Sequence, residues 1–164
     1  MCRKMAQTRP VVLTKTPEAN IAIFALLLNF PWEILQAPLY RGMAEASHAQ
    51  ATQACLRATL GDVALMLFAY AAVAVCARSR HWILKPRRWQ LGSFVAIGVS
   101  VTAAIEWLAT RGLWVTGWVY LPAMPLVPGT GIGLVPMVQW LILPLLTVWF
   151  VQRQLAVIAR AGSL

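Results

Sequence analysis

The sequence predicts an all-helical membrane protein, a single domain in which four transmembrane helices form a bundle. Of its 164 residues, 60% are hydrophobic and only 12% are charged, and the mean hydropathy is +0.68. A soluble domain carries about 25% charged residues. Four apolar runs suit helices that cross a hydrocarbon core, which takes about 20 residues per helix. Polar, basic or Trp/Pro/Gly-rich segments separate these runs.

The first span is expected at about residues 18–40. It follows residues 1–16, a basic segment that we interpret as a cytoplasmic lead-in. Thr16, Pro17 and Glu18 then match an N-cap, a first-turn proline and a first-turn acid. A cleaved signal peptide is the rival interpretation. We favour an uncleaved span, because the segment between Phe30 and a possible cleavage site at Ala46 is too long and irregular.

The other three spans are expected at about residues 62–77, 91–110 and 132–151. Thr59 and Asp62 have the spacing of a capping box, so we interpret Asp62 as a cap of the second helix, and a further role is left open. A Trp-, Pro- and Gly-rich external loop is expected between the third and fourth helices. Small residues recur at every fourth position of the third span and should let a neighbouring helix approach closely. They are Gly92, Ala96, Ser100 and Ala104.

The distribution of basic residues predicts the orientation. Four lysines and arginines precede the first span, five lie in residues 78–88 and two follow the last span, whereas only Arg41, Arg57 and Arg111 lie on the other side. Because cytoplasmic loops are enriched in basic residues, both termini should be cytoplasmic, in a bacterial-type inner (plasma) membrane.

The placement of the charged residues, histidines and cysteines argues against nucleic-acid binding and metal binding. A net charge of +9 would suit nucleic acid, but the cations lie between apolar runs and form no recognition pattern, so we expect no nucleic-acid partner. Single histidines, His48 and His81, lie on opposite sides, and the three cysteines form no CxxC pair, so no metal site is expected. The sequence does not identify a cofactor.

A polar stripe inside the first span marks the candidate site. Asn29, Glu33, Gln36 and Tyr40 fall at i, i+4, i+7 and i+11, which is one helix face. A charged side chain at the centre of a membrane helix costs about 2.5–3.5 kcal/mol on insertion scales, so it needs a partner or a use. Glu33 is therefore the first candidate for a catalytic residue.

Helix rise places further polar residues near the same depth. At ~1.5 Å per residue, Glu33 and Gln139 lie about 10 Å from the outer boundary, and Glu106 lies at about 6 Å. We expect Glu33 and Glu106 to form an acidic pair in a cavity open to the outer face. Two carboxyls in such a cavity cannot both ionise cheaply, so one proton donor would lie beside one base.

Aromatic residues and one arginine are expected to line this pocket. Indole faces could hold a cationic ligand or intermediate, and Arg111 could neutralise Glu106 or hold an anionic headgroup. The expected lining residues, besides the polar stripe and Gln139, are Trp32, Trp107, Arg111, Trp114, Trp118, Tyr120 and Trp140. Structural interpretations stay open: Glu33 could simply pin helices together through Gln139 or Asn29, and the loop residues could form only an interfacial belt.

Three functions follow as hypotheses. The first is binding or proton-transfer chemistry on an apolar lipid or isoprenoid-like substrate. The second is a non-catalytic subunit or assembly factor of a larger membrane complex. The third is a small proton-coupled transporter, which would act as a homodimer, although the inner half of the spans offers no polar exit route. The expected partners are membrane lipids and an apolar small molecule.

Overall fold

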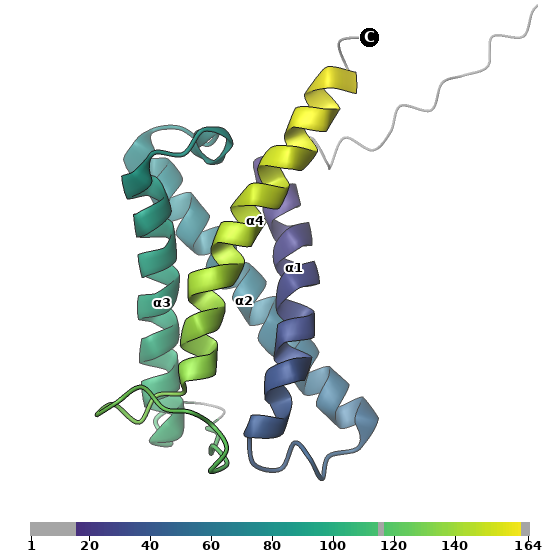
Figure 1. The fold of residues 1–164 in the computed structure, drawn as a ribbon, viewed down its shortest axis with the longest axis vertical. Coiled ribbons are helices and arrows are strands. Elements are labelled where there is room, and N and C mark those ends of the chain that lie inside the picture. Colours follow the sequence, from purple (N-terminus) through teal and green to yellow (C-terminus); the bar gives the residue numbers. More distant parts are fainter. Residues whose placement is uncertain (1–15, 115–116, 162–164) are drawn as a thin grey trace, which may run out of the picture.

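The computed structural model describes residues 16–114 and 117–161, which form four long helices (Figure 1). They are α1 (Pro17–Gln36), α2 (His48–Ala77), α3 (Arg88–Thr110) and α4 (Leu134–Ala161), with short 3-10 helices η2 (Ala37–Leu39) and η3 (Trp82–Leu84). All four long helices are apolar and long enough to cross a membrane. The described residues contain no strand, only two isolated β-bridges. The prediction of an all-helical chain with four such helices is confirmed. The predicted lead-in lies outside the described residues except for Thr16.

The first helix begins where the sequence predicts. The Thr16 hydroxyl accepts a hydrogen bond from the Ala19 backbone N–H at 3.4 Å, and proline occupies the first turn. Pro31 lies inside α1 without ending it, and the chain then tightens into η2, whose second residue is Pro38. The polar stripe therefore continues on one uninterrupted helix as far as Gln36.

The second helix begins earlier than predicted, which overturns the interpretation of Asp62. α2 starts at His48, where Ser47 and Gln50 form a complete capping box. Thr59 lies well inside the helix and donates to the carbonyl of Cys55 at 2.8 Å. Asp62 is therefore a mid-helix residue and not a cap. The prediction failed because the first turns of α2 are polar and exposed, so the helix extends beyond its apolar run.

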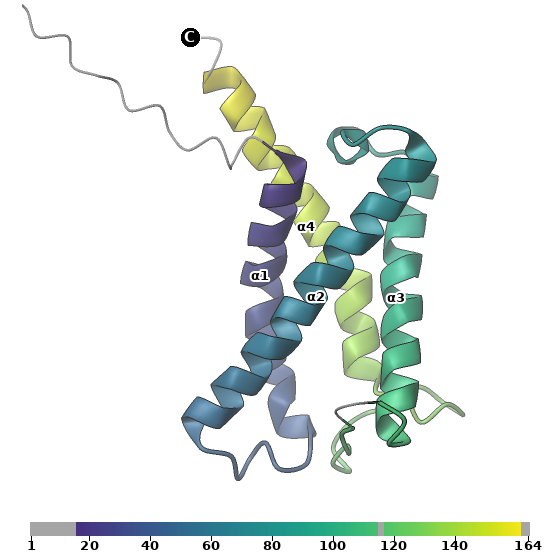
Figure 2. The same ribbon diagram turned by 180° about the vertical axis from the view of Figure 1, so that it is seen from behind.

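The helices pack in a ring in which α1 and α3 each contact α2 and α4. Figures 1 and 2 show α2 and α4 crossing on opposite sides of the molecule, with α1 and α3 at its flanks. One end of the bundle, here called the α2–α3 end, holds the connection of residues 78–87, the start of α1 and the end of α4. The opposite α3–α4 end holds the connections of residues 40–47 and 117–133.

The apolar core is concentrated toward the α2–α3 end. Trp82 of η3 lies 5.8 Å from Tyr70 and 5.6 Å from Phe94 between ring centroids, and its indole N–H donates to the Tyr70 carbonyl. The Tyr70 hydroxyl bonds to Glu18 and to the carbonyl of Arg80. The buried core residues are Ile21, Ala25, Met66, Ala69, Tyr70, Val73, Trp82, Ile83, Phe94, Trp140, Val148 and Val151. Apart from Glu18 at the start of α1, the acidic residues lie in the half of the bundle toward the α3–α4 end.

The close approach predicted for α3 exists, but on the face opposite to the predicted one. The four small residues Gly92, Ala96, Ser100 and Ala104 are all exposed. Gly98 makes the contact instead, because a Cβ built there would lie 2.0 Å from the ring of Trp140. Buried residues of α3 also recur every fourth position, so spacing alone could not identify the packed face.

Candidate functional site

A cluster of buried polar side chains joins α1, α2 and α4 around Gln139. This side chain is 2% exposed. Its Nε2 donates to Asn29 Oδ1 at 2.8 Å, to Asp62 Oδ2 at 2.9 Å and to Glu33 Oε1 at 3.2 Å. Glu33 and Gln139 therefore lie at one level of the bundle, in direct contact between α1 and α4. With Gln36, these residues form what we call the Gln139 cluster.

The α1 members of the cluster are the predicted polar stripe. Asn29, Glu33 and Gln36 are all buried, as their helical spacing indicated. Gln36 Nε2 donates to Glu33 Oε1 at 2.7 Å, and Asn29 Nδ2 donates to the carbonyl of Ala25 at 2.7 Å. The Oε1 atom of Gln36 is buried without a hydrogen-bond partner.

The two carboxyl groups of the cluster have amide donors and no basic partner. Among the described residues, the one ion pair joins Arg80 to Glu18 at the α2–α3 end. The Nε2 of Gln139 carries two hydrogens but faces three acceptors, so it cannot satisfy all of them fully. A proton on Glu33 or Asp62 would supply the missing donor. The arrangement is therefore suited to holding and transferring a proton.

Glu33 is paired with Asp62 and not with Glu106, which corrects the predicted acidic pair. Glu106, on α3, is 5% exposed and belongs to a second cluster. It accepts hydrogen bonds from the indole N–H of Trp118 at 3.0 Å and from the Tyr120 hydroxyl. The Tyr120 hydroxyl also accepts from the backbone N–H of Gly133 at 3.0 Å. Asp62 was missed because its helix was expected to begin there, although the capping signal at Ser47 and Gln50 was present in the sequence.

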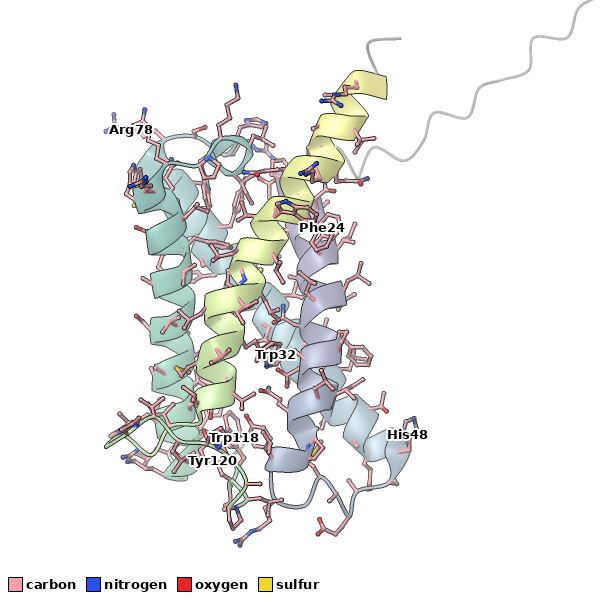
Figure 3. The ribbon with its side chains drawn as sticks, in the orientation of Figure 1. Phe24, Trp32, His48, Arg78, Trp118 and Tyr120 are labelled. Atoms are coloured by element: carbon pink, nitrogen blue, oxygen red, sulfur yellow. The ribbon has the colours of Figure 1, made fainter. Side chains whose placement is uncertain are left out.

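Tyr40 packs against the second cluster. Its ring centroid is 5.6 Å from that of Tyr120 and 6.3 Å from that of Trp118, and a β-bridge pairs Tyr40 with Tyr120. Burial raises the pKa of Tyr40, and the charges of Glu106 and Glu33 act in the same direction. Burial and the hydrogen bond with Glu106 likewise raise the pKa of Tyr120. Figure 3 shows Trp118 and Tyr120 together at the α3–α4 end, with Trp32 nearer the middle of the bundle.

The remaining predicted lining residues are not gathered around Glu33. Trp140 is packed in the apolar core, and Trp107 and Trp114 are exposed. The Arg111 guanidinium lies 4.3 Å from the centroid of the Trp107 ring and donates to the Trp107 carbonyl at 3.2 Å. Arg111 thus binds its own helix terminus and does not neutralise Glu106. The indole nitrogen of Trp32 is buried without a hydrogen-bond partner.

Two cavities can be described, and neither is lined by Glu33, Asp62 or Glu106. One, of about 490 Å³, lies beside the start of α2 and is lined by Gly42, Met43, Glu45, Ala46, Gln50, Gln53, Ala54 and Arg57. The other, of about 280 Å³, lies between α2 and α3 and is lined by Ala72, Val73, Cys76, Trp89, Ser93, Ala96 and Ile97. These acidic residues instead contact amide, indole and hydroxyl donors.

Comparison with known proteins identifies no family for this chain. No protein-family model matches the chain, and no match is found among curated proteins or among solved structures. Within the part of the chain that the structure describes, no group of three or more His, Cys, Asp or Glu side chains could hold a metal ion. The protein is defined by its four apolar helices and its two polar clusters.

Proposed function

We propose that the chain is a multi-pass protein of a bacterial-type inner membrane, with both termini in the cytoplasm. Four helices of suitable length and hydropathy support this assignment. Large apolar side chains cover their outer surfaces; Leu35 is 78% exposed and Val75 is 77% exposed. Lipid would cover such surfaces, which are costly in water. Residues 78–88 carry five basic side chains at the α2–α3 end, which fits a cytoplasmic location for that end.

Within this membrane protein, the function that we propose is proton transfer to or from an apolar lipid or isoprenoid-like substrate. The observation that carries the proposal is the shared donor of Glu33 and Asp62. Two carboxyls that compete for one amide in a low-dielectric bundle favour a shared proton over two charges. One carboxyl can then act as an acid while the other acts as a base.

We propose that protons reach this pair from water by way of the second cluster. Tyr40 packs against Tyr120, whose hydroxyl bonds to Glu106 near the α3–α4 end. In the proposed orientation this is the outer end, so the chemistry belongs to the outer half of the bilayer. Tyrosine hydroxyls both donate and accept hydrogen bonds, as a relay requires.

The test compares membrane lipids from bacterial cells that express the wild-type protein or a variant. Mass spectrometry of lipid extracts should show converted lipid with the wild type and with Glu45→Gln, which changes an exposed acid. Glu33→Gln and Asp62→Asn should abolish the conversion while the protein still elutes as a folded species in detergent. A fully active Glu33→Gln variant, or no lipid difference between the wild type and an empty vector, would overturn the proposal.

One observation favours a second candidate, a non-catalytic subunit or assembly factor. The ribbon of Gly92, Ala96, Ser100 and Ala104 is exposed on α3, and small residues are typical of helix contacts in membranes. A partner protein or a second copy could pack there. Purification in mild detergent tests this: a stoichiometric co-purifying chain or a dimer supports it, and a monodisperse monomer counts against it.

A further inference from the structure

The Gln139 cluster contains more hydrogen-bond acceptors than donors. Its side-chain oxygens comprise two carboxyl groups, on Glu33 and Asp62, and three amide oxygens, on Asn29, Gln36 and Gln139. The donors are amide groups alone, and that of Asn29 is directed to the backbone carbonyl of Ala25. Since no ion pair joins these carboxyl groups to a basic side chain in the described residues, the cluster is electronegative.

Gln36 provides an independent sign of a missing positive partner. Its side chain is 5% exposed, and its Oε1 is buried without a donor. The Nε2 atom of the same amide lies 2.7 Å from Glu33 Oε1, so the amide that carries the unpartnered oxygen belongs to the cluster. A buried acceptor without a donor is unfavourable. A proton shared by Glu33 and Asp62 leaves both this oxygen and one negative charge uncompensated.

We propose that the Gln139 cluster binds a monovalent alkali cation, for which Na⁺ is the probe. Glu33, Asp62 and the Oε1 of Gln36 would be its ligands, because hard cations are bound by carboxylate and amide oxygens. One such cation balances the single charge that remains when the two carboxyls share a proton. A divalent ion is disfavoured, because the described residues offer no third acid, histidine or cysteine at one site.

The inference uses the cluster of the proposed function but goes beyond it and needs no substrate. Cation binding can therefore be found without lipid conversion, and lipid conversion without cation binding. The experiment below measures binding to the resting protein, so that its failure leaves the test on lipids unaffected.

The test measures thermal unfolding of the full chain in detergent. NaCl replaces choline chloride at constant ionic strength, because choline is too large for a site formed by side-chain oxygens. Sodium should raise the melting temperature saturably, by about 3–6 °C at concentrations well above the dissociation constant. Gln36→Met, which removes the ligand oxygen at similar size, should lose this shift. The matched control Gln53→Met changes an exposed glutamine and should keep it.

A second measurement guards against a variant that fails to fold. Wild-type protein should retain radioactive sodium in a binding assay, and excess unlabelled NaCl should displace it. Three results would overturn the proposal: equal melting temperatures in sodium and choline, a sodium shift that persists in both Gln36→Met and Asp62→Asn, or stabilisation by CaCl₂ alone.

Discussion

Glu33 on α1 and Asp62 on α2 share a hydrogen-bond donor, the Nε2 of Gln139 on α4. The donor lies 3.2 Å from Glu33 Oε1 and 2.9 Å from Asp62 Oδ2. A single amide thus holds three helices together at one level of the bundle. Because the carboxyls come from different helices, any change in their protonation or their donor acts on the packing of α1 against α2.

Replacing the shared donor should destabilise the bundle. Gln139→Leu leaves buried acceptors on Asn29, Glu33 and Asp62 without this donor, and an unsatisfied buried group costs about 1–3 kcal/mol. We expect a loss of stability in this range, measured by unfolding in detergent mixtures of increasing SDS content. Gln53→Leu, at an exposed position of α2, is the control and should change stability little. Equal stabilities of the two variants would show that the Gln139 contacts contribute nothing.

The sequence predicted the α1 half of this cluster, because helical spacing alone places Asn29, Glu33 and Gln36 on one face. It did not predict Asp62. Hydropathy marks the part of a helix that suits a membrane, and α2 continues for several turns beyond that part. A residue at the edge of the apolar run was therefore mistaken for a residue at the edge of the helix.

The contact of Gly98 with Trp140 predicts opposite effects for two glycines of α3. Gly98→Ala places a methyl group where the indole lies, and overpacking of a core costs about 1–3 kcal/mol. Gly92→Ala meets no atom within 4 Å and should stabilise the helix by about 0.5–1 kcal/mol. Thermal or SDS unfolding of both variants checks this. If Gly98→Ala were as stable as Gly92→Ala, the close approach of α3 to α4 would be wrong.

The Tyr120 hydroxyl should resist ionisation in the folded protein. Its pKa lies above the ordinary value of 10.0, because the phenol is partly buried and hydrogen-bonded to Glu106. A group whose pKa is raised by folding stabilises the fold fully below its unfolded pKa, and this contribution is lost as the pH rises through the folded pKa. Tyr120 should therefore stabilise the fold up to about pH 10 and lose this effect above it.

The measurement for Tyr120 is a spectroscopic pH titration of tyrosinate absorbance. The difference between the wild type and Tyr120→Phe isolates this residue from the other two tyrosines of the chain. The difference signal should develop above the pH at which free tyrosine ionises. A midpoint at the ordinary value would show that Tyr120 is not held by Glu106.

The second cluster shows a different limit of sequence reasoning. Glu106, Trp118 and Tyr120 were all candidates, but their contact depends on the path of the connection after α3, and loops have no periodicity from which a path can be predicted. The pairing of Tyr40 with Tyr120 fixes this path, with the backbone N–H of Arg41 donating to the Val119 carbonyl at 2.8 Å. Depth along a helix indicated a level for Glu106, but it could not indicate its partners.

The proposed orientation predicts the outcome of reporter fusions at the two ends of the bundle. Alkaline phosphatase, which is active only outside the cytoplasm, should be active when inserted after Ala46 or Thr130, in connections at the α3–α4 end. It should be inactive after Lys85 or at the C-terminus, where a fluorescent protein should instead be bright. The physical reason is that five basic residues at positions 78–88 favour retention on the cytoplasmic side.

Replacing these five with glutamine should weaken the bias and produce mixed reporter signals, whereas glutamine at Arg41, Arg57 and Arg111 should leave the pattern unchanged. A reversed pattern would place the second cluster, around Glu106, on the cytoplasmic side. A chain found wholly in the soluble fraction would refute membrane insertion.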